Sequence, residues 1–273
     1  MKYVFVSSVI LGLETLKELV DKNFKPFAVL TQKENILKNK SGGIDFKEFC
    51  NKKKIICKAI KNINDESIVR YLEKLNIDWL FIVGWSQLAS NKILKLPKYG
   101  SIGIHPTLLP IGRGRAPIPW SIIKKLKYTG VTLFLLKQNA DTGNIIDQLK
   151  IKISRNETAS SLYKKIAILH KKIIRKNIKK IKDNNFKEKK QQISKGSYWQ
   201  KRNPEDGEIF QSFTTDKAYR YIRALTHPYP GAFIRLGSKK LIIWNATISN
   251  NRPNRDYIKM RDGYIILKEI SIC

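Results

Sequence analysis

The sequence predicts an α/β fold: a mostly parallel sheet with helices on both faces, followed by a small, mostly β C-terminal subdomain. Before about residue 129, short apolar runs alternate with amphipathic segments, an order typical of parallel strands joined by crossover helices. After residue 196, strand-like runs follow one another with a single helical segment among them. We therefore expect a first domain at residues 1–196 and a β-rich subdomain at residues 197–273.

The strands of the first domain are expected where apolar runs are bounded by turn residues. Asp78–Gly84 (DWLFIVG) is a continuous apolar run, as expected of a strand that is buried on both faces. The strands expected here are Lys2–Ser8, Pro26–Thr31, Ile55–Lys58, Asp78–Gly84 and Ser101–His105. The helices expected between and after them are Leu11–Lys22, Asp45–Lys53, Asp65–Asn76 with Asp65 as N-cap, and Pro117–Lys127. Gln32–Gly43 shows no periodicity and is expected to be a loop.

The second half of the chain follows a different order. Gly130–Leu136 and Ile145–Ile153 read as strands without a helix between them. Apolar residues three and four apart then predict an amphipathic helix over Leu162–Ile181, and Asn184–Lys195 is a polar connector. The C-terminal elements expected are strands at Glu208–Thr214, Ala232–Leu236, Lys240–Ile248 and Tyr264–Ser271, and a helix at Asp216–Leu225.

The composition is that of a strongly basic globular protein. The chain has 273 residues, 42% of them hydrophobic, with 53 Lys+Arg against 22 Asp+Glu and a net charge of +31. This apolar share can bury a core and excludes a disordered chain. Fifteen basic and two acidic residues lie between Ser160 and Arg202, but many of them alternate with the apolar stripe of the helix. We favour a solvated helix face over an anionic-ligand surface, so nucleic-acid binding is not predicted from charge alone.

Metal binding, disulfides and membrane insertion have little support in the sequence. Cys50, Cys57 and Cys273 form no disulfide framework, and the spacing of the first two is not that of zinc ligands. No apolar run approaches the roughly 18 residues of a spanning helix. The N-terminus lacks a cleavage-site pattern and reads as a first strand and helix. We expect a cytoplasmic protein without a metal or a membrane segment.

Three histidines are the candidates for proton-transfer chemistry, because dinucleotide, P-loop and zinc-protease motifs are absent. His170 falls among lysines and is expected at the surface, and His227 lies in the turn-rich stretch LTHPYPGAF. His105 closes a predicted strand, and ligands of open α/β sheets bind beyond the carboxyl ends of the strands. His105 is therefore the candidate general base, although a plain capping residue is the alternative.

Asp141 is the candidate partner of His105. It lies in the turn Asn139–Gly143, after the predicted strand Gly130–Leu136. If that strand returns beside Ser101–His105, the carboxylate comes close to the imidazole, which it would orient and stabilise as a cation. The alternative is an ordinary Asp-Thr-Gly turn.

Five short segments together resemble a known family. They are His105–Pro110 (HPTLLP), Thr129–Thr132 (TGVT) with Asp141–Gly143 (DTG), Arg202–Gly207 (RNPEDG) and Pro228–Phe233 (PYPGAF). In this order they resemble the motifs of folate-dependent formyltransferases, and the last two resemble the nucleotide-sugar branch. The resemblance implies a Rossmann-like fold and transfer of a formyl group from N10-formyltetrahydrofolate, a co-substrate, to an amine without a metal.

The resemblance also implies a set of site residues. His105 and Asp141 correspond to the catalytic pair. The stretch Gly112–Arg115 (GRGR) and the two C-terminal motifs correspond to the acceptor side. The folate would contact Trp85, Ser86, Gln87, Leu88, Asn139 and Ala140. The residues expected to bind the acceptor are Arg113, Arg115, Trp199, Arg202, Arg223 and Tyr229, with core packing as the alternative for the aromatic ones.

One position departs from the family pattern. The family's triad contains an Asn two residues before the His, and this sequence has Gly103 there. Loss of one oxyanion donor typically costs about 10²–10³ in rate. Either another donor substitutes for the amide or the chain is inactive, and the intact His105 and Asp141 favour activity.

The sequence thus predicts a sugar N-formyltransferase that acts on a nucleotide-linked amino sugar for glycan biosynthesis, as a homodimer. One alternative is a methionyl-tRNA formyltransferase, which the basic charge favours. The short segment after Pro230 argues against it, because that branch carries a larger C-terminal barrel. A second alternative is a folate-binding relative that has lost activity through Gly103.

Overall fold

The computed structural model describes residues 1–273 and divides them into two compact units. Unit 1 consists of Met1–Gly114, Gly130–Lys150 and Lys165–Tyr198. Unit 2 consists of Arg115–Thr129, Ile151–Lys164 and Trp199–Cys273. Each unit is assembled from three separate segments of the chain. The predicted domains at residues 1–196 and 197–273 stay a prediction.

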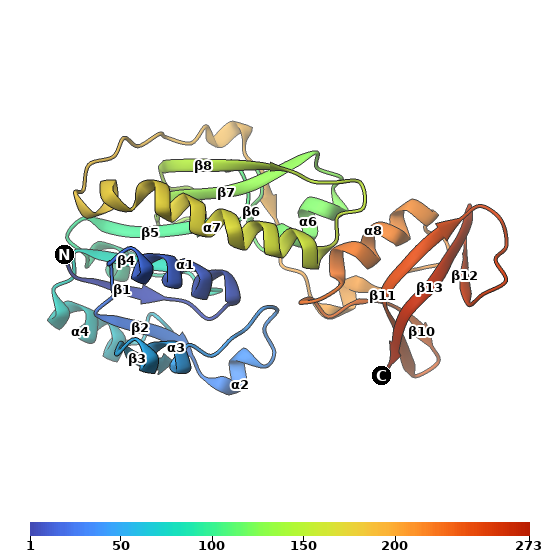
Figure 1. Ribbon diagram of the computed structural model, residues 1–273, viewed down its shortest axis with the longest axis horizontal. Coiled ribbons are helices and arrows are strands. Elements are labelled where there is room, and N and C mark those ends of the chain that lie inside the picture. The colour runs from blue at the N-terminus through green and yellow to red at the C-terminus, as the bar shows by residue number, and fades with distance from the viewer. The chain divides into compact units, whose positions relative to one another are not determined.

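A seven-stranded sheet forms the centre of unit 1, in the order β3-β2-β1-β4-β5-β7-β8 (Figure 1). Its strands are β1 (Tyr3–Val6), β2 (Ala28–Gln32), β3 (Ile56–Ile60), β4 (Trp79–Val83), β5 (Gly100–His105), β7 (Tyr128–Leu135) and β8 (Ile145–Lys152). The first five strands pair in parallel, and β7 runs antiparallel to β5. The mostly parallel sheet is therefore confirmed, and the carboxyl ends of β1, β4 and β5 lie at one edge of it.

Helices cover both faces of this sheet. On one face, α4 (Glu66–Leu75) and α5 (Asn91–Lys95) place Leu72 and Ile93 against Val4, Leu30 and Leu80. On the other face lie α1 (Ile10–Asp21) and α7 (Ala159–Lys182) (Figure 1). There the Trp79 indole of β4 donates to the carbonyl of Ile181 at 3.3 Å. Both layers bury the apolar side chains of the strands between them, which is the main source of stability in such folds.

The apolar stripe predicted for the long helix is confirmed in α7. Its members are Leu162, Ile166, Leu169, Ile173, Ile174, Ile178 and Ile181, and each is buried. Ile168, which lies off this stripe, is 53% exposed. The lysines of α7 thus occupy the opposite side of an amphipathic helix.

Unit 2 is built on a four-stranded antiparallel sheet in the order β10-β11-β13-β12 (Figure 1). Its strands are β10 (Ala232–Leu236), β11 (Lys239–Ser249), β12 (Tyr257–Met260) and β13 (Gly263–Ile272). Helix α8 (Thr215–Leu225) packs on β11 and β13 and also contacts α6 (Pro117–Ile123). The Thr214 hydroxyl caps α8 by accepting from the amide of Lys217 at 3.2 Å.

The remaining elements are short. They are α2 (Glu34–Leu37), α3 (Lys47–Lys52), β6 (Arg113–Gly114), β9 (Tyr198–Trp199) and two 3₁₀ turns, η1 (Ile193–Lys195) and η2 (Pro204–Gly207). Strands β6 and β9 pair with each other. No helix of the chain combines the length and the apolar character needed to span a bilayer.

Several expected elements were wrong or missing. Glu208–Thr214 is not a strand, because the chain turns back where the Phe213 amide donates to the carbonyl of Phe210, leaving one isolated bridge from Glu208 to Phe233. Asp65 occupies the N-cap position of α4, but its side chain makes no capping bond. Helices α2 and α5 and strand β12 were not expected, since each has too few residues to show a hydrophobic period.

Candidate active site

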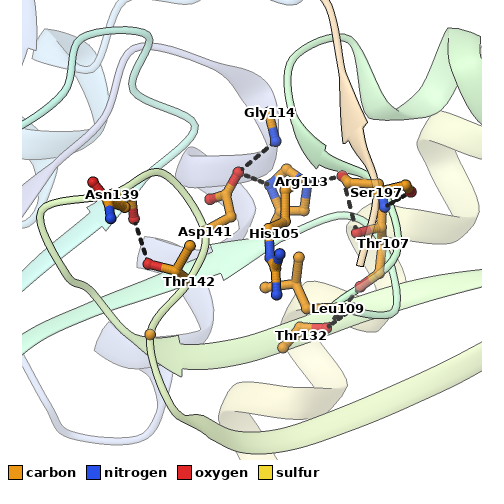
Figure 2. A network of polar contacts seen from close by, with 12 residues as sticks. His105, Thr107, Leu109, Arg113, Gly114, Thr132, Asn139, Asp141, Thr142 and Ser197 are labelled. Carbon is orange, nitrogen blue, oxygen red and sulfur yellow. Dashed lines mark hydrogen bonds and ion pairs between the residues drawn. The ribbon is translucent and has the colours of Figure 1, made fainter. Parts of the chain in front are cut away.

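His105 is the last residue of β5, at the edge of the sheet where the parallel strands end. The side chain is buried, with 7% of its surface exposed. Its Nε2 atom lies 2.7 Å from the carbonyl oxygen of Gly112 (Figure 2). A carbonyl only accepts hydrogen bonds, so Nε2 carries the proton in this arrangement and its lone pair is not available as a base.

Asp141 faces the other nitrogen of the same ring. Its Oδ2 atom lies 3.5 Å from Nδ1 of His105 and accepts a hydrogen bond from the amide of Gly114 at 2.8 Å (Figure 2). Asp141 adopts a left-handed backbone conformation with φ of 56°, which aims its side chain out of the turn that follows β7. The pairing of β5 with β7 therefore brings the two predicted residues together.

The geometry constrains where the protons are. With Nε2 protonated, a neutral ring would direct the Nδ1 lone pair at the Asp141 carboxylate, and the two groups would repel each other. A proton between Nδ1 and Oδ2 would make the contact attractive. Asp141 is thus placed to orient the His105 ring and to stabilise the ring once it is protonated.

The segment after His105 is held by the Thr132 side chain. The Thr132 hydroxyl donates to the carbonyl of Thr107 at 2.7 Å and accepts from the amide of Leu109 at 3.1 Å (Figure 2). The Gln148 side-chain amide, from β8, donates to Thr132 and to the carbonyl of Leu109, both at 2.8 Å. These buried bonds fix the loop that carries Gly112, and with it the position of the His105 ring.

Position 103, where the family carries an amide, has no room for a side chain unless its neighbours move. A Cβ atom at Gly103 would lie 2.7 Å from Cδ2 of Leu136 and 3.0 Å from Cε1 of Phe134. Phe134 belongs to β7 and packs with Leu109 and Ile145 in a small apolar cluster, against which Leu136 also packs. The space beside Gly103 is therefore filled by apolar side chains of the neighbouring strand and the residue that follows it.

Residues 8–178 match the formyl transferase family model, and residues 201–270 match the model of the formyl transferase C-terminal domain. The chain belongs to the formyl transferase family. It is 37% identical over 249 residues to a bifunctional polymyxin resistance protein ArnA of Wigglesworthia glossinidia brevipalpis. That alignment covers 91% of this chain and 38% of the relative, so the chain spans less than half of that protein's length.

Two further family members cover most of both chains. A methionyl-tRNA formyltransferase of Caldanaerobacter subterraneus subsp. tengcongensis is 29% identical over 275 residues, which is 97% of this chain and 88% of that protein. An N-formyltransferase from Helicobacter canadensis, solved with folinic acid and dTDP-3-aminofucose, superposes with a TM-score of 0.72 at 21% identity. The superposition covers 99% of this chain and 100% of the Helicobacter chain, and it confirms the predicted fold.

Unit 1 of the present chain contains a cavity of about 380 Å³ beside the turn that carries Asp141. The cavity is lined by Asn91, Leu94, Lys95, Leu136, Lys137, Gln138, Asn139 and Thr142. Its volume falls in the range of small-molecule sites. Leu94 and Leu136 give it apolar walls, and the Asn91 amide reaches the Gln138 side chain at 2.7 Å at its rim.

Of the residues predicted to bind folate, Asn139 lines the cavity, whereas Ala140 and the segment Trp85–Leu88 do not. The Gln87 side chain forms hydrogen bonds within the chain: its Oε1 accepts from the amide of Ile63 at 3.1 Å and from the Trp85 indole at 3.2 Å. Ser86 and Leu88 are exposed, with Leu88 at 63%. The contacts of these side chains with folate remain a prediction.

The residues predicted to bind the acceptor are divided between the units. Arg113 is in unit 1, and Arg115, Trp199, Arg202, Arg223 and Tyr229 are in unit 2. Arg113 is fully buried, and its guanidinium donates two hydrogen bonds to the Oε1 atom of Gln191. The contact of Arg113 with a substrate remains a prediction.

Within unit 2, Arg202 stacks on two aromatic rings, 4.9 Å from Trp120 and 5.5 Å from Tyr221. Arg223 donates from Nη1 to the carbonyl of Glu157 at 2.7 Å, and burial lowers the pKa of its guanidinium.

The other predicted acceptor residues of unit 2 differ in exposure: Trp199 is buried, Tyr229 is half-buried and Arg115 is exposed. Burial raises the pKa of the Tyr229 phenol. The Arg115 amide donates to the carbonyl of Trp199 at 3.0 Å. Their contacts with a substrate remain predictions.

His170 was expected at the surface, and this was wrong. It is 1% exposed, on the buried side of α7, and its Nδ1 lies 3.0 Å from the hydroxyl of Thr15 in α1. Because that hydroxyl donates to the carbonyl of Leu11, Nδ1 carries the proton. Burial, and to a lesser degree the charge of His105, lowers the pKa of His170 to about 3, so the ring is neutral.

Sequence reasoning missed the residues that hold the pair in place. Gln191 lies in the polar connector, and Gln148 in a strand, and neither carries a motif signal. Thr132 could have been found, because it is the last residue of the TGVT motif. The chain contains no group of three or more His, Cys, Asp or Glu side chains arranged to hold a metal ion.

Proposed function

We propose that this formyl transferase moves a formyl group from N10-formyltetrahydrofolate to the amine of a nucleotide-linked amino sugar. The carrying observation is the contact between His105 and Asp141 at the sheet edge, beside a cavity lined by the same turn. The complex of the Helicobacter canadensis N-formyltransferase with folinic acid and dTDP-3-aminofucose supports this donor and acceptor class.

Each residue has a defined task in this proposal. The donor supplies the one-carbon unit when bound, with Asn139 and Thr142 among the residues that would hold it. A protonated His105 ring would stabilise negative charge on the formyl oxygen while the acceptor amine forms the new C–N bond, and the bond from the formyl carbon to N10 of the donor then breaks. Asp141 holds the ring and stabilises its charge. The proton lost by the amine goes to the leaving nitrogen of the donor, directly or through water.

The missing amide at Gly103 is compatible with this scheme if His105 acts as the principal electrophile. Both ring nitrogens face protein groups, the Gly112 carbonyl and the Asp141 carboxylate, so a protonated ring would act on the formyl oxygen through its positive charge. Holding two substrates in a reactive geometry contributes a large part of the acceleration in bimolecular transfers. The proposal therefore predicts an active enzyme, and not a folate-binding relative without turnover.

The second candidate is formylation of methionyl-tRNA. Two observations favour it: the net charge of +31, and the full-length match to a methionyl-tRNA formyltransferase. The complex of the Helicobacter canadensis N-formyltransferase with dTDP-3-aminofucose favours the sugar acceptor.

A formyl-transfer assay with N10-formyltetrahydrofolate separates these candidates. The acceptors would be a panel of UDP-, dTDP- and GDP-linked amino sugars, with methionyl-tRNA in parallel. We expect turnover with at least one nucleotide sugar and none with methionyl-tRNA. Turnover with methionyl-tRNA alone would replace the proposal by the second candidate. Donor binding without any transfer would indicate the inactive relative.

A further inference from the structure

The Gln191 side chain connects the turn that carries Asp141 to the buried guanidinium of Arg113. Its Nε2 donates to two carbonyls of that turn, of Asp141 at 2.8 Å and of Gly143 at 2.7 Å. Its Oε1 accepts from Nε of Arg113 at 3.1 Å and from Nη2 at 2.9 Å. The amide fits in one orientation only, because carbonyls accept and a guanidinium donates.

Arg113 is itself firmly held. Its side chain is fully buried, its amide donates to the carbonyl of Ser197 at 2.9 Å, and its guanidinium lies 5.3 Å from the ring of Tyr198. A Cβ at Gly196 would lie 2.5 Å from Nη1, so the guanidinium sits directly against the backbone there. Arg113 thus provides a rigid base from which Gln191 reaches the turn.

Three consecutive residues of the chain therefore act on the His105–Asp141 pair. The Gly112 carbonyl accepts from the His105 ring at 2.7 Å, and the Gly114 amide donates to the Asp141 carboxylate at 2.8 Å. Between them, the Arg113 side chain reaches the Asp141 backbone through Gln191. Both members of the pair are therefore bonded to the backbone of one short segment, His105 to the Gly112 carbonyl and Asp141 to the Gly114 amide.

The Asp141 turn needs such support. A non-glycine residue at φ of 56° is in a sparsely populated conformation that persists only when its surroundings enforce it. Within the turn, Thr142 donates to the carbonyl of Asn139 through its hydroxyl at 2.8 Å, but its amide contact with the same carbonyl is long, at 3.4 Å. The two bonds from Gln191 lock the carbonyls on either side of Thr142.

We infer that Gln191 is a positioning residue for the proposed formyl transfer, holding Asp141 in register with His105, and that Arg113 serves this purpose and not substrate binding. The inference rests on the proposed function of the pair. A displacement of about 1 Å between catalytic groups can lower a rate by as much as 10²-fold. Loss of the two donated bonds should therefore reduce kcat and leave the KM values of both substrates nearly unchanged.

Gln191→Glu is the informative variant. It keeps an acceptor for Arg113, so the buried cation stays paired, but it turns an oxygen toward the carbonyls of Asp141 and Gly143. Gln192→Glu is the matched control, because Gln192 is the next residue, is exposed and receives the same charge change. Both variants are compared with the unmodified chain in full steady-state kinetics and in amide hydrogen exchange of residues 139–144.

We expect kcat of Gln191→Glu to fall by about 10- to 100-fold, with faster exchange in residues 139–144 and neither effect in Gln192→Glu. Wild-type kcat in Gln191→Glu would overturn the inference. If the unmodified chain transfers no formyl group to any acceptor, the proposed function fails, and hydrogen exchange alone decides on the positioning role. Unchanged exchange in residues 139–144 of Gln191→Glu would then overturn it, and faster exchange would support it.

Discussion

At the scale of single residues, the site is defined by the lack of a side chain at position 103 as well as by His105 and Asp141. Phe134 and Leu136 take the space that a side chain at position 103 would need. The apolar cluster and the glycine are therefore two parts of one arrangement. Restoring the family's Asn by a single substitution does not restore its environment.

Gly103→Asn is accordingly expected to lower stability without raising turnover. Its Cβ alone approaches Leu136 to 2.7 Å, and overpacking of this kind costs about 1–3 kcal/mol. Urea unfolding measures the loss, and Gly103→Asn with Leu136→Ala should recover part of it. A single Asn variant as stable as the wild type and faster in formyl transfer would show that the space beside Gly103 is open to a side chain.

The same scale marks the limit of what the sequence could predict. The approach of Asp141 to His105 was predicted, because a strand returning beside Ser101–His105 leaves few other places for the turn. The hydrogen bonds of Gln191 to Asp141 and Arg113 were not, since they join residues more than 45 positions apart without any local pattern. The burial of Arg113 was missed for the same reason.

At the scale of elements, α7 shows why hydrophobic period is a stronger signal than charge. The lysines did not indicate how the helix packs, whereas the apolar stripe located its buried face. The stripe did not reveal His170, because a histidine next to Leu169 on a lysine-rich helix carries no sign of its buried partner Thr15 in α1. Tertiary contacts of this kind require the packing of two helices to be known.

The stripe gives a direct test of this packing. Ile166→Ala should cost about 2–5 kcal/mol of unfolding free energy, because Ile166 is fully buried and its removal leaves a cavity. Ile168→Ala, two residues along the same helix at 53% exposure, should cost far less. Denaturant titration compares the two variants. Equal losses would mean that α7 does not pack through the stripe.

His170 makes a second prediction for this helix, concerning acid stability. Its pKa of about 3 in the folded protein is depressed from the ordinary 6.5, so between these values the unfolded chain binds a proton that the folded chain does not. The contribution of the neutral His170 ring to the free energy of unfolding is fully present above pH 6.5. It falls by about 1 kcal/mol per pH unit as the pH decreases toward 3.

His170→Asn tests this, because its amide can still donate to Thr15 but cannot titrate. Thermal or urea unfolding between pH 7 and 4 should show a smaller loss of stability in the variant than in the wild type. Parallel stability curves for the two proteins would contradict a neutral, buried His170.

At the scale of the whole molecule, the alternation of apolar runs was sufficient to predict a mostly parallel sheet with helices on both faces and a β-rich C-terminal part. What could not be predicted is how the chain is shared between the two units, since each takes three separate segments. Short elements such as α5 and β12 could not be predicted either, because α5 has only five residues and β12 only four. The family, in contrast, follows from ordered motifs that span both parts of the chain.

The central claim is that the His105–Asp141 pair carries formyl transfer from N10-formyltetrahydrofolate to a nucleotide-linked amino sugar. The most direct measurement is the formyl-transfer rate of the wild type, His105→Ala and Asp141→Asn, with Asp183→Asn at an exposed carboxylate as control. With circular dichroism showing all four folded, we expect transfer by the wild type and the control, and losses of at least about 100-fold in the two site variants. Near-normal transfer by a folded His105→Ala would contradict a catalytic role for the pair.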